Sequence, residues 1–151
     1  MNRGLTYSRM GQYQRSIQDF DQGIRLEPSA SRYNSRGISY GRLSQHQRAI
    51  EDFDEAIRLD LNYKKAYGNR GIAYGKLGQH QRDIEDFDEF IRLDPGDAKA
   101  YGNRGYAYGR LGQHQRAIED LNEAIRLEPN QPWAYLNRGI AKRNLGLGKY
   151  A

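Results

Sequence analysis

The chain has 151 residues and a net charge of +5, with 37% hydrophobic and 28% charged residues. It has no cysteine, which excludes disulfides and thiolate metal sites. No stretch reaches the roughly 18 apolar residues of a membrane span, and no signal peptide is recognisable. The sequence leaves the compartment open and favours a cytoplasmic location. The excess of basic residues favours acidic partners.

The chain repeats itself. Gly71, Gly105 and Gly139 are 34 residues apart, whereas Gly4 and Gly37 are 33 apart because the linker at 27–32 is one residue shorter. A period of this length is typical of a solenoid, in which each unit contacts mainly its neighbours. We therefore expect one continuous solenoid with units at 1–30, 31–64, 65–98 and 99–132 and a terminal helix at 133–151.

Each unit is predicted to be a helical hairpin. In the fourth unit Tyr101, Gly105 and Tyr108 share one face of a first helix, because they are three or four residues apart. Gly112 supplies a turn, and Pro129 stops a second helix. The same pattern predicts first helices near 1–11, 31–43, 65–77, 99–111 and 133–145. It predicts second helices near 14–26, 47–59, 81–93 and 115–127.

These positions resemble the tetratricopeptide repeat, whose pattern is W-x2-L-G-x2-Y, then A-x3-F, then P. The matching residues are Tyr101, Arg104, Gly105, Tyr108, Ala117, Leu121, Ala124 and Pro129 in one unit, and Tyr67, Arg70, Gly71, Tyr74, Phe87 and Pro95 in the unit before it. The resemblance covers the chain from end to end. It implies an all-α, right-handed α-solenoid whose first helices line a concave groove for peptides and partner proteins.

Arginine occupies a position where the family prefers a buried leucine, in the row Arg3, Arg36, Arg70, Arg104 and Arg138. An unpaired buried guanidinium costs several kcal/mol or more. The second helices offer carboxylates at matching intervals, in the row Asp19, Asp52, Asp86 and Asp120. We predict that the two rows pair and that their role is structural rather than ligand-binding. Asp83 and Phe90 replace alanines of the other units, so the third unit should pack differently.

The groove should lie on the face of the first helices opposite the tyrosines and glycines. The candidate peptide-binding residues on this face are Arg9, Arg42, Lys65, Asn69, Ile72, Lys76, Lys99, Asn103, Tyr106, Arg110 and Asn137. Further positions on it are Ser31, Ser35, Ile38, Trp133, Ile140 and Asn144. We expect the flanking glycines Gly68, Gly75, Gly102 and Gly109 to leave the face open.

The charges are divided between the two kinds of helix. All 19 acidic residues lie outside the predicted first helices. Cations interleaved with asparagines should attract an acidic, extended segment, because an asparagine both donates and accepts hydrogen bonds. The alternative is an ordinary solvated basic face, with the acids forming helix pairs such as Asp54 with Arg58 and Asp88 with Arg92.

Other sites are not expected. Asn69 and Asn103 match one asparagine of the family's carboxylate clamp, but Gly68, Gly102 and Ile72 depart from it. Helices pack ~8–10 Å apart, so histidines one repeat apart cannot share a metal ion. The three histidines, His46, His80 and His114, should pack in turns. The segment 146–149 lacks the spacing of a phosphate loop. We predict no cofactor, no metal and no enzymatic activity.

The leading hypothesis is a protein–protein interaction scaffold that binds an acidic or extended peptide. A first alternative is self-assembly, because Met1 and Ala151 fall inside the repeat pattern as if the chain were cut from a longer array, and open ends can associate. Lys142, in place of a tyrosine, indicates instead a capping helix. A second, less favoured alternative is nucleic-acid binding, because the middle units offer only Tyr106 for base stacking.

Overall fold

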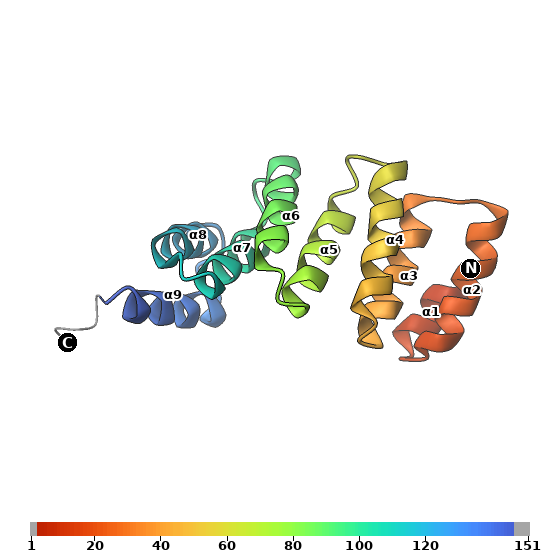
Figure 1. The fold of residues 1–151 in the computed structure, drawn as a ribbon, viewed down its shortest axis with the longest axis horizontal. Coiled ribbons are helices and arrows are strands. Elements are labelled where there is room, and N and C mark those ends of the chain that lie inside the picture. The colour runs from red at the N-terminus through yellow and green to blue at the C-terminus, as the bar shows by residue number, and fades with distance from the viewer. Residues whose placement is uncertain (1–2, 147–151) are drawn as a thin grey trace. The chain divides into compact units, whose positions relative to one another are not determined.

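The structure is a computed structural model and describes residues 3–146. These residues form nine helices and no strand, as shown in Figure 1. The helices are α1 Arg3–Arg9, α2 Tyr13–Leu26, α3 Ala30–Arg42, α4 His46–Leu59, α5 Lys64–Lys76, α6 His80–Leu93, α7 Ala98–Arg110, α8 His114–Leu127 and α9 Pro132–Asn144. The predicted all-α class and the succession of helical hairpins are confirmed. The expectations for Met1, Ala151 and most of the segment 146–149 lie outside the described residues.

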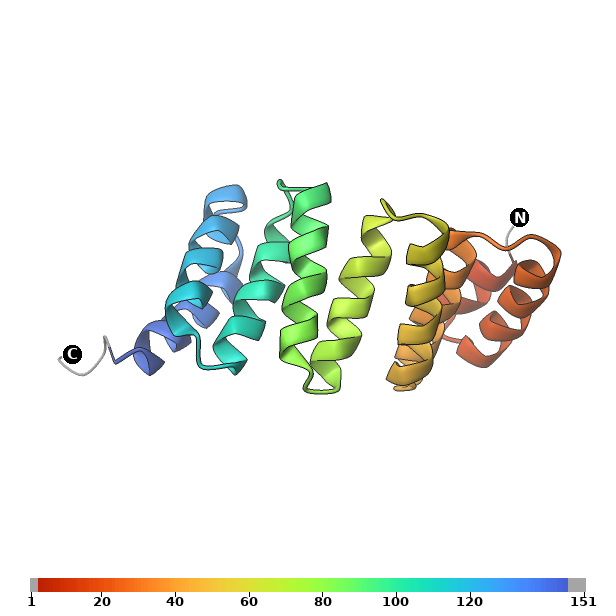
Figure 2. The same ribbon diagram turned by 45° about the horizontal axis from the view of Figure 1, so that its top comes forward.

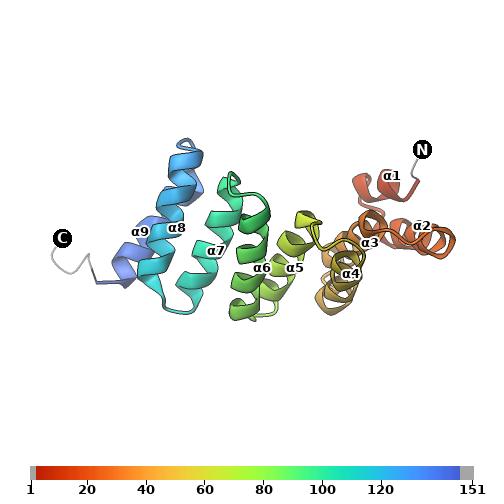
Figure 3. The same cartoon turned by 90° about the horizontal axis from the view of Figure 1, so that it is seen from above.

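The chain divides after Leu77 into two compact units. In the first unit the successive helices from α1 to α5 pack against one another, and α3 also contacts α5 (Figure 3). In the second unit α6 to α9 pack in the same way, and α7 also contacts α9 (Figure 2). First helices of successive repeats therefore lie side by side within each unit. Along residues 3–146, no helix combines the length and the apolar character needed to cross a membrane.

The second helices are amphipathic, and α4 shows why. Ala49, Ile50, Phe53, Ala56 and Ile57 are buried, and they recur at the three- and four-residue intervals of one helical face. The remaining positions of α4 are mostly charged. This one buried stripe packs α4 against the first helices on both sides, α3 and α5.

The turn inside each hairpin needs a left-handed residue. Gly11, Gly78 and Gly112 have φ between 72° and 75°, which glycine adopts without a Cβ penalty. Ser44 takes the same place between α3 and α4 with a φ of 60°. The turn geometry is therefore kept where the glycine is missing.

Close helix contact explains a second set of glycines. A Cβ atom on Gly37 would lie 2.6 Å from the Phe53 ring, and one on Gly105 would lie 3.1 Å from the Cβ of Asp120. A larger residue at either position would separate the first helix from the second helix of its own hairpin.

Candidate functional site

Each unit has its own candidate binding surface. It is the side of the first helices that carries the basic, asparagine and apolar residues predicted above, on α1, α3 and α5 in the first unit and on α7 and α9 in the second. We call this side of each unit its groove face. Asn69 and Asn137 are half-buried there. The exposed candidates are Arg9, Arg42, Lys65, Ile72, Lys76, Lys99, Asn103, Tyr106 and Arg110. Of these, Arg9 on α1 and Lys65 at the start of α5 line none of the pockets described below.

A pocket of about 350 Å³ lies in the first unit between α3, α4 and α5, and we call it the α3–α5 pocket. The buried residues Ala49, Phe53 and Ala73 form its base. Its other lining residues are Gly37, Ile38, Gly41, Arg42, His46, Asn69, Ile72 and Lys76. The pocket therefore combines an apolar base with basic and amide groups at its edge.

A second pocket of about 330 Å³ occupies the same place in the second unit, and we call it the α7–α9 pocket. Its lining residues are Gly105, Tyr106, Gly109, Arg110, His114, Ala117, Leu121, Asn137, Ile140, Ala141 and Asn144. Each of them stands two repeats after a residue of the α3–α5 pocket. Two units of the chain thus build the same hollow from equivalent positions.

A third pocket, of about 370 Å³, lies between α7 and α9. Its lining residues are Lys99, Gly102, Asn103, Tyr106, Trp133 and Asn137. Tyr106 and Asn137 also line the α7–α9 pocket, so the two hollows adjoin. Trp133 is half-buried, and its indole N–H donates a hydrogen bond to Gln131 Oε1 at 3.0 Å. We call this hollow the Trp133 pocket.

The prediction that the flanking glycines leave the face open is wrong for Gly102 and Gly68, which are both buried. A Cβ on Gly102 would lie 2.2 Å from the Trp133 ring, so the indole occupies the space that this glycine leaves. The prediction is correct for Gly109, where a Cβ would meet only the Ala117 Cβ at 4.0 Å.

Asn69 is partly committed to a contact within the protein. Its Nδ2 donates to Asn34 Oδ1 at 2.9 Å, and Asn34 is buried on α3. Sequence reasoning did not consider Asn34. It stands where Gly68 and Gly102 stand in the next two repeats, and this exchange of glycine for asparagine is visible in the sequence.

The predicted arginine–aspartate pairs form away from the groove face. Arg36 binds Asp52 through Nε at 2.9 Å and Nη2 at 2.6 Å, and Arg104 binds Asp120 at 2.8 and 2.7 Å. The Arg36 side chain is only 20% exposed and that of Asp52 6%. Loss of water raises the pKa of the Asp52 carboxyl despite the opposing hydrogen bonds from Arg36. The same hydrogen bonds raise the pKa of Arg36, which stays charged.

At the first arginine of the row the same pair forms, but the arginine itself is exposed. Arg3 binds Asp19 at 2.8 and 2.6 Å, but its side chain is 74% exposed. The hydrogen bond from Arg3 lowers the pKa of Asp19. Burial of the arginine therefore distinguishes the inner pairs from this one.

The structure reveals a second carboxylate row that sequence reasoning missed. Arg36 also binds Asp21 at 2.7 Å, Arg70 binds Asp54 at 2.7 Å and Arg104 binds Asp88 at 2.8 Å. Arg138 donates at 2.7 Å to Asn122, which takes this place on α8. Each arginine thus reaches the second helix of the preceding repeat. The recurring Asp-x-Asp spacing of the second helices was the signal available in the sequence.

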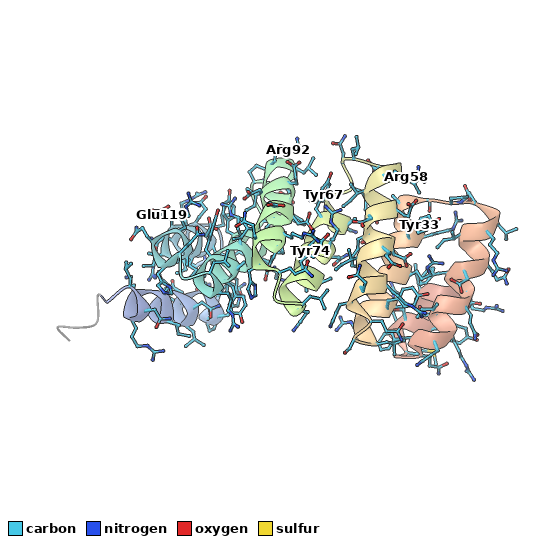
Figure 4. All side chains as sticks on the ribbon, in the orientation of Figure 1. Tyr33, Arg58, Tyr67, Tyr74, Arg92 and Glu119 are labelled. Carbon is cyan, nitrogen blue, oxygen red and sulfur yellow. The ribbon has the colours of Figure 1, made fainter. Side chains whose placement is uncertain are left out.

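The helix pairs that the alternative of a solvated basic face assigned to Asp54 and Asp88 do not form. Arg58 binds Glu55 at 2.9 Å, and Arg92 binds Glu89 at 2.9 Å. Figure 4 shows Arg58 and Arg92 projecting from the ends of α4 and α6. Asp54 is instead the partner of Arg70.

Tyrosines stack on the arginine row. The guanidinium carbon of Arg70 lies 5.7 Å from the centroid of the Tyr67 ring and 6.0 Å from that of Tyr74. Figure 4 shows these two tyrosines along α5. Arg36 and Arg104 are stacked in the same way on the tyrosines three residues before and four residues after them. Such contacts contribute ~0.5–2 kcal/mol each.

The histidines were predicted to pack in the turns, but each is the first residue of a second helix, next to the turn. His46 and His114 also line the α3–α5 and α7–α9 pockets, which sequence reasoning did not foresee. Within residues 3–146, no group of three or more acidic or histidine side chains could hold a metal ion.

Asp83 is the unusual buried acid of the chain. It is buried on α6, and its Oδ1 has no hydrogen-bond partner among the described residues. Loss of water, together with the nearby charge of Asp86, raises the pKa of Asp83 to about 7. The equivalent residues Ala49 and Ala117 are apolar and buried, so the carboxyl is a local departure from the repeat.

Sequence models of the tetratricopeptide repeat match residues 1–29, 34–98 and 98–131. The chain belongs to the tetratricopeptide-repeat family. The hairpins, the turn glycines and the packed glycines are therefore those of tandem tetratricopeptide repeats, and the fold is an all-α helical-repeat solenoid. No functionally curated protein matches the sequence.

Solved tetratricopeptide-repeat structures share this fold. A crystal structure of MamA has a TM-score of 0.92 at 26% identity and covers 97% of this chain and 86% of its own. The first such domain of Spaghetti (RPAP3), bound to the HSP90 peptide SRMEEVD, has a TM-score of 0.76 at 24% identity, covering 78% of this chain and 93% of its own. YrrB, described as having an unusual peptide-binding site, has 0.83 at 23%, covering 90% and 71%.

Proposed function

We propose that this protein is an interaction module that binds an acidic, extended peptide segment on its groove face. The observation that carries the proposal is the division of charge. Helices α1, α3, α5, α7 and α9 contain no acidic residue, while their exposed positions include Arg42, Lys76, Lys99 and Arg110. A surface of one sign attracts a partner of the opposite sign and speeds its association.

The amide and apolar groups of the groove face suit an extended chain. Asn103 and Asn137 lie beside Tyr106, and an asparagine can bond both the N–H and the C=O groups of a peptide backbone. Exposed Ile72 and Tyr106 offer apolar contact between the cations. Within each unit a peptide would thus meet cations, an asparagine and an exposed apolar side chain.

Two of the similar structures support peptide binding as the use of this fold. The RPAP3 domain holds a peptide with two consecutive glutamates and a terminal Val-Asp, and YrrB is described by its peptide-binding site. The family and fold are in general those of non-enzymatic interaction modules. Acidity of the partner and the groove-face residues are our proposal for this chain.

The test is a fluorescence titration. Trp133 is the only tryptophan of the chain and lines a groove-face pocket, so its emission reports on binding there. We expect a short peptide of alternating glutamate and leucine to change the emission, and a matched lysine–leucine peptide to leave it unchanged. The double variant Arg42→Glu and Arg110→Glu should weaken binding of the acidic peptide by about tenfold or more. Added salt should also weaken binding of this peptide to the wild type, because salt screens the charges.

A matched control separates local charge from net charge. Arg58 and Arg126 lie on α4 and α8 and are exposed, so Arg58→Glu with Arg126→Glu changes the net charge equally. This control should bind the acidic peptide almost as the wild type does. Equal loss in both double variants, or a preference for a single-stranded oligonucleotide over the peptide, would refute the proposal.

Self-association is a second candidate, favoured by the outer face of α9. Tyr135 and Leu136 are exposed there, and a Cβ on Gly139 would meet nothing within 4 Å, whereas the equivalent Gly105 is packed. Light scattering at high concentration tests it. A dimer or chain that Gly139→Arg disrupts would support this candidate, and a strict monomer would remove it.

A further inference from the structure

The chain keeps the same hollow in both units, and a general attraction between opposite charges does not explain why. At most positions the pockets keep the kind of group even where the residue changes, although Lys76 is replaced by Asn144. Phe53 is replaced by Leu121 at the base, and Ile38 by Tyr106 at the side. The hollow is thus preserved while its exact surface varies.

One glycine in each pocket has no role in the fold. A Cβ on Gly41 would meet nothing within 4 Å, and one on Gly109 would meet only the Ala117 Cβ at 4.0 Å. Both glycines are helical, and neither has a positive φ. Glycine inside a helix costs ~0.5–1 kcal/mol relative to alanine. Helix packing requires Gly37 and Gly105, but neither packing nor backbone conformation requires Gly41 and Gly109.

The missing side chains keep the pockets open. Gly41 lines the α3–α5 pocket and Gly109 lines the α7–α9 pocket, so any side chain at either place would project into the hollow. A volume of about 330 to 350 Å³ over an alanine, phenylalanine or leucine base accepts one bulky apolar group. Apolar burial of this kind contributes roughly 1.5–3 kcal/mol for a full leucine or phenylalanine side chain.

The edges of the pockets specify what lies next to that group. Arg42 and Lys76 line one pocket and Arg110 lines the other, and among the described lining residues none is acidic. Asn69 and Asn137 occupy the same place in the two pockets. The edge therefore complements a carboxylate, while the base complements an apolar side chain.

We propose that each pocket is a subsite for one bulky aliphatic or aromatic side chain of an extended peptide, with an adjacent acidic residue bound by Arg42 or Arg110. Gly41 and Gly109 are the residues that determine this specificity. The inference rests on the proposed function, and it adds an apolar anchor to a segment otherwise recognised by charge.

The test is a selection from a display library of short random peptides on the immobilised full chain. Wild-type protein should enrich peptides in which a leucine, isoleucine, phenylalanine or tryptophan neighbours aspartate or glutamate. The variant Gly41→Leu with Gly109→Leu fills both pockets and should bind the enriched peptides at least about tenfold more weakly, the scale of losing one buried apolar side chain. Thermal unfolding should show this variant to be no less stable than wild type, because leucine favours the helix.

The control is Gly139→Leu, a glycine-to-leucine change on α9 at a position that lines neither pocket. It should leave the selection and the affinity unchanged. Enrichment of acidic peptides without a bulky apolar residue, or unaltered affinity of the pocket-filling variant, would overturn this inference and leave the proposed function intact. Failure to enrich any acidic peptide would overturn both.

Discussion

At the scale of single residues, the arginine row joins successive repeats. Arg36 binds Asp52 of its own hairpin and Asp21 of the preceding one, and it stacks on Tyr33 and Tyr40. A leucine at this place would bury apolar surface but would leave both carboxylates without a partner. The arginine therefore lacks the apolar core contact that a leucine would make, and instead it binds carboxylates on both sides of the junction between two repeats.

Removal of one such arginine should be costly. Arg104→Leu leaves the largely buried Asp120 carboxylate uncompensated, so we expect the free energy of unfolding to fall by roughly 2–4 kcal/mol in urea titrations. Adding Asp120→Ala should recover much of that loss. The matched change Arg3→Leu should have a much smaller effect, because the Arg3 side chain is 74% exposed. Equal losses at the two positions would contradict this role.

Asp83 should make stability depend on pH. Its pKa is about 7 in the folded state and 3.8 as an unperturbed group, so between these pH values the folded chain holds a proton that the unfolded chain has released. Stability therefore falls as the pH rises from about 4 to about 7. Asp83→Ala should raise the free energy of unfolding at pH 7 by a few kcal/mol and flatten this slope. Urea titrations at several pH values, with the exposed Glu51→Ala as control, measure it.

At the scale of helices, the sequence predicted most of the architecture. Boundaries agree to within a few residues, because each hairpin carries a turn residue and a regular apolar stripe, as α4 does with Ala49, Phe53 and Ala56. The periodicity also placed Lys99, Asn103 and Arg110 on one exposed face. These features depend on local spacing, which a single sequence contains.

Contacts between helices were harder to predict. The bond from Asn69 to Asn34 and the Trp133 ring on Gly102 join residues about a repeat apart, and spacing on one helix says nothing about them. The second carboxylate row was missed because the sequence offers Asp54 another possible partner, Arg58 on its own helix. In the structure Asp54 binds Arg70, and Arg58 binds Glu55. Choosing among several possible partners requires the positions of the helices in space.

The turn at Ser44 offers a test at this scale. Three turns have glycine with φ near 72° to 75°, but Ser44 adopts a φ of 60° with a Cβ atom present. A left-handed conformation costs a residue with a Cβ roughly 1–2 kcal/mol. Glycine avoids this cost, but it loses more chain entropy on folding, which offsets part of the gain. We expect Ser44→Gly to raise the free energy of unfolding by about 0.5–1 kcal/mol, with Ser35→Gly, in the middle of α3, lowering it. A lower free energy of unfolding for Ser44→Gly would contradict the view that the left-handed conformation of Ser44 is strained.

At the scale of the whole chain, the division of charge connects the fold with the proposed function. Aspartates of the second helices, such as Asp52 and Asp120, are partners of the arginine row, whereas the first helices carry exposed cations and no acidic residue. In the proposed function these aspartates hold the repeats together, and the exposed cations of the first helices bind the partner. The equivalent pockets add an apolar component in both units.

The most direct test of binding on the groove face is hydrogen–deuterium exchange of the full chain, with and without an acidic peptide taken from the library selection. We predict slower exchange in α3, α5, α7 and α9, which carry Arg42, Ile72, Tyr106 and Asn137. The change in α4 and α8 should be smaller, because their residues at the base of the pockets are already buried in the free protein. Slower exchange confined to the second helices, or no protected helix at a peptide concentration that saturates the Trp133 signal, would contradict the account.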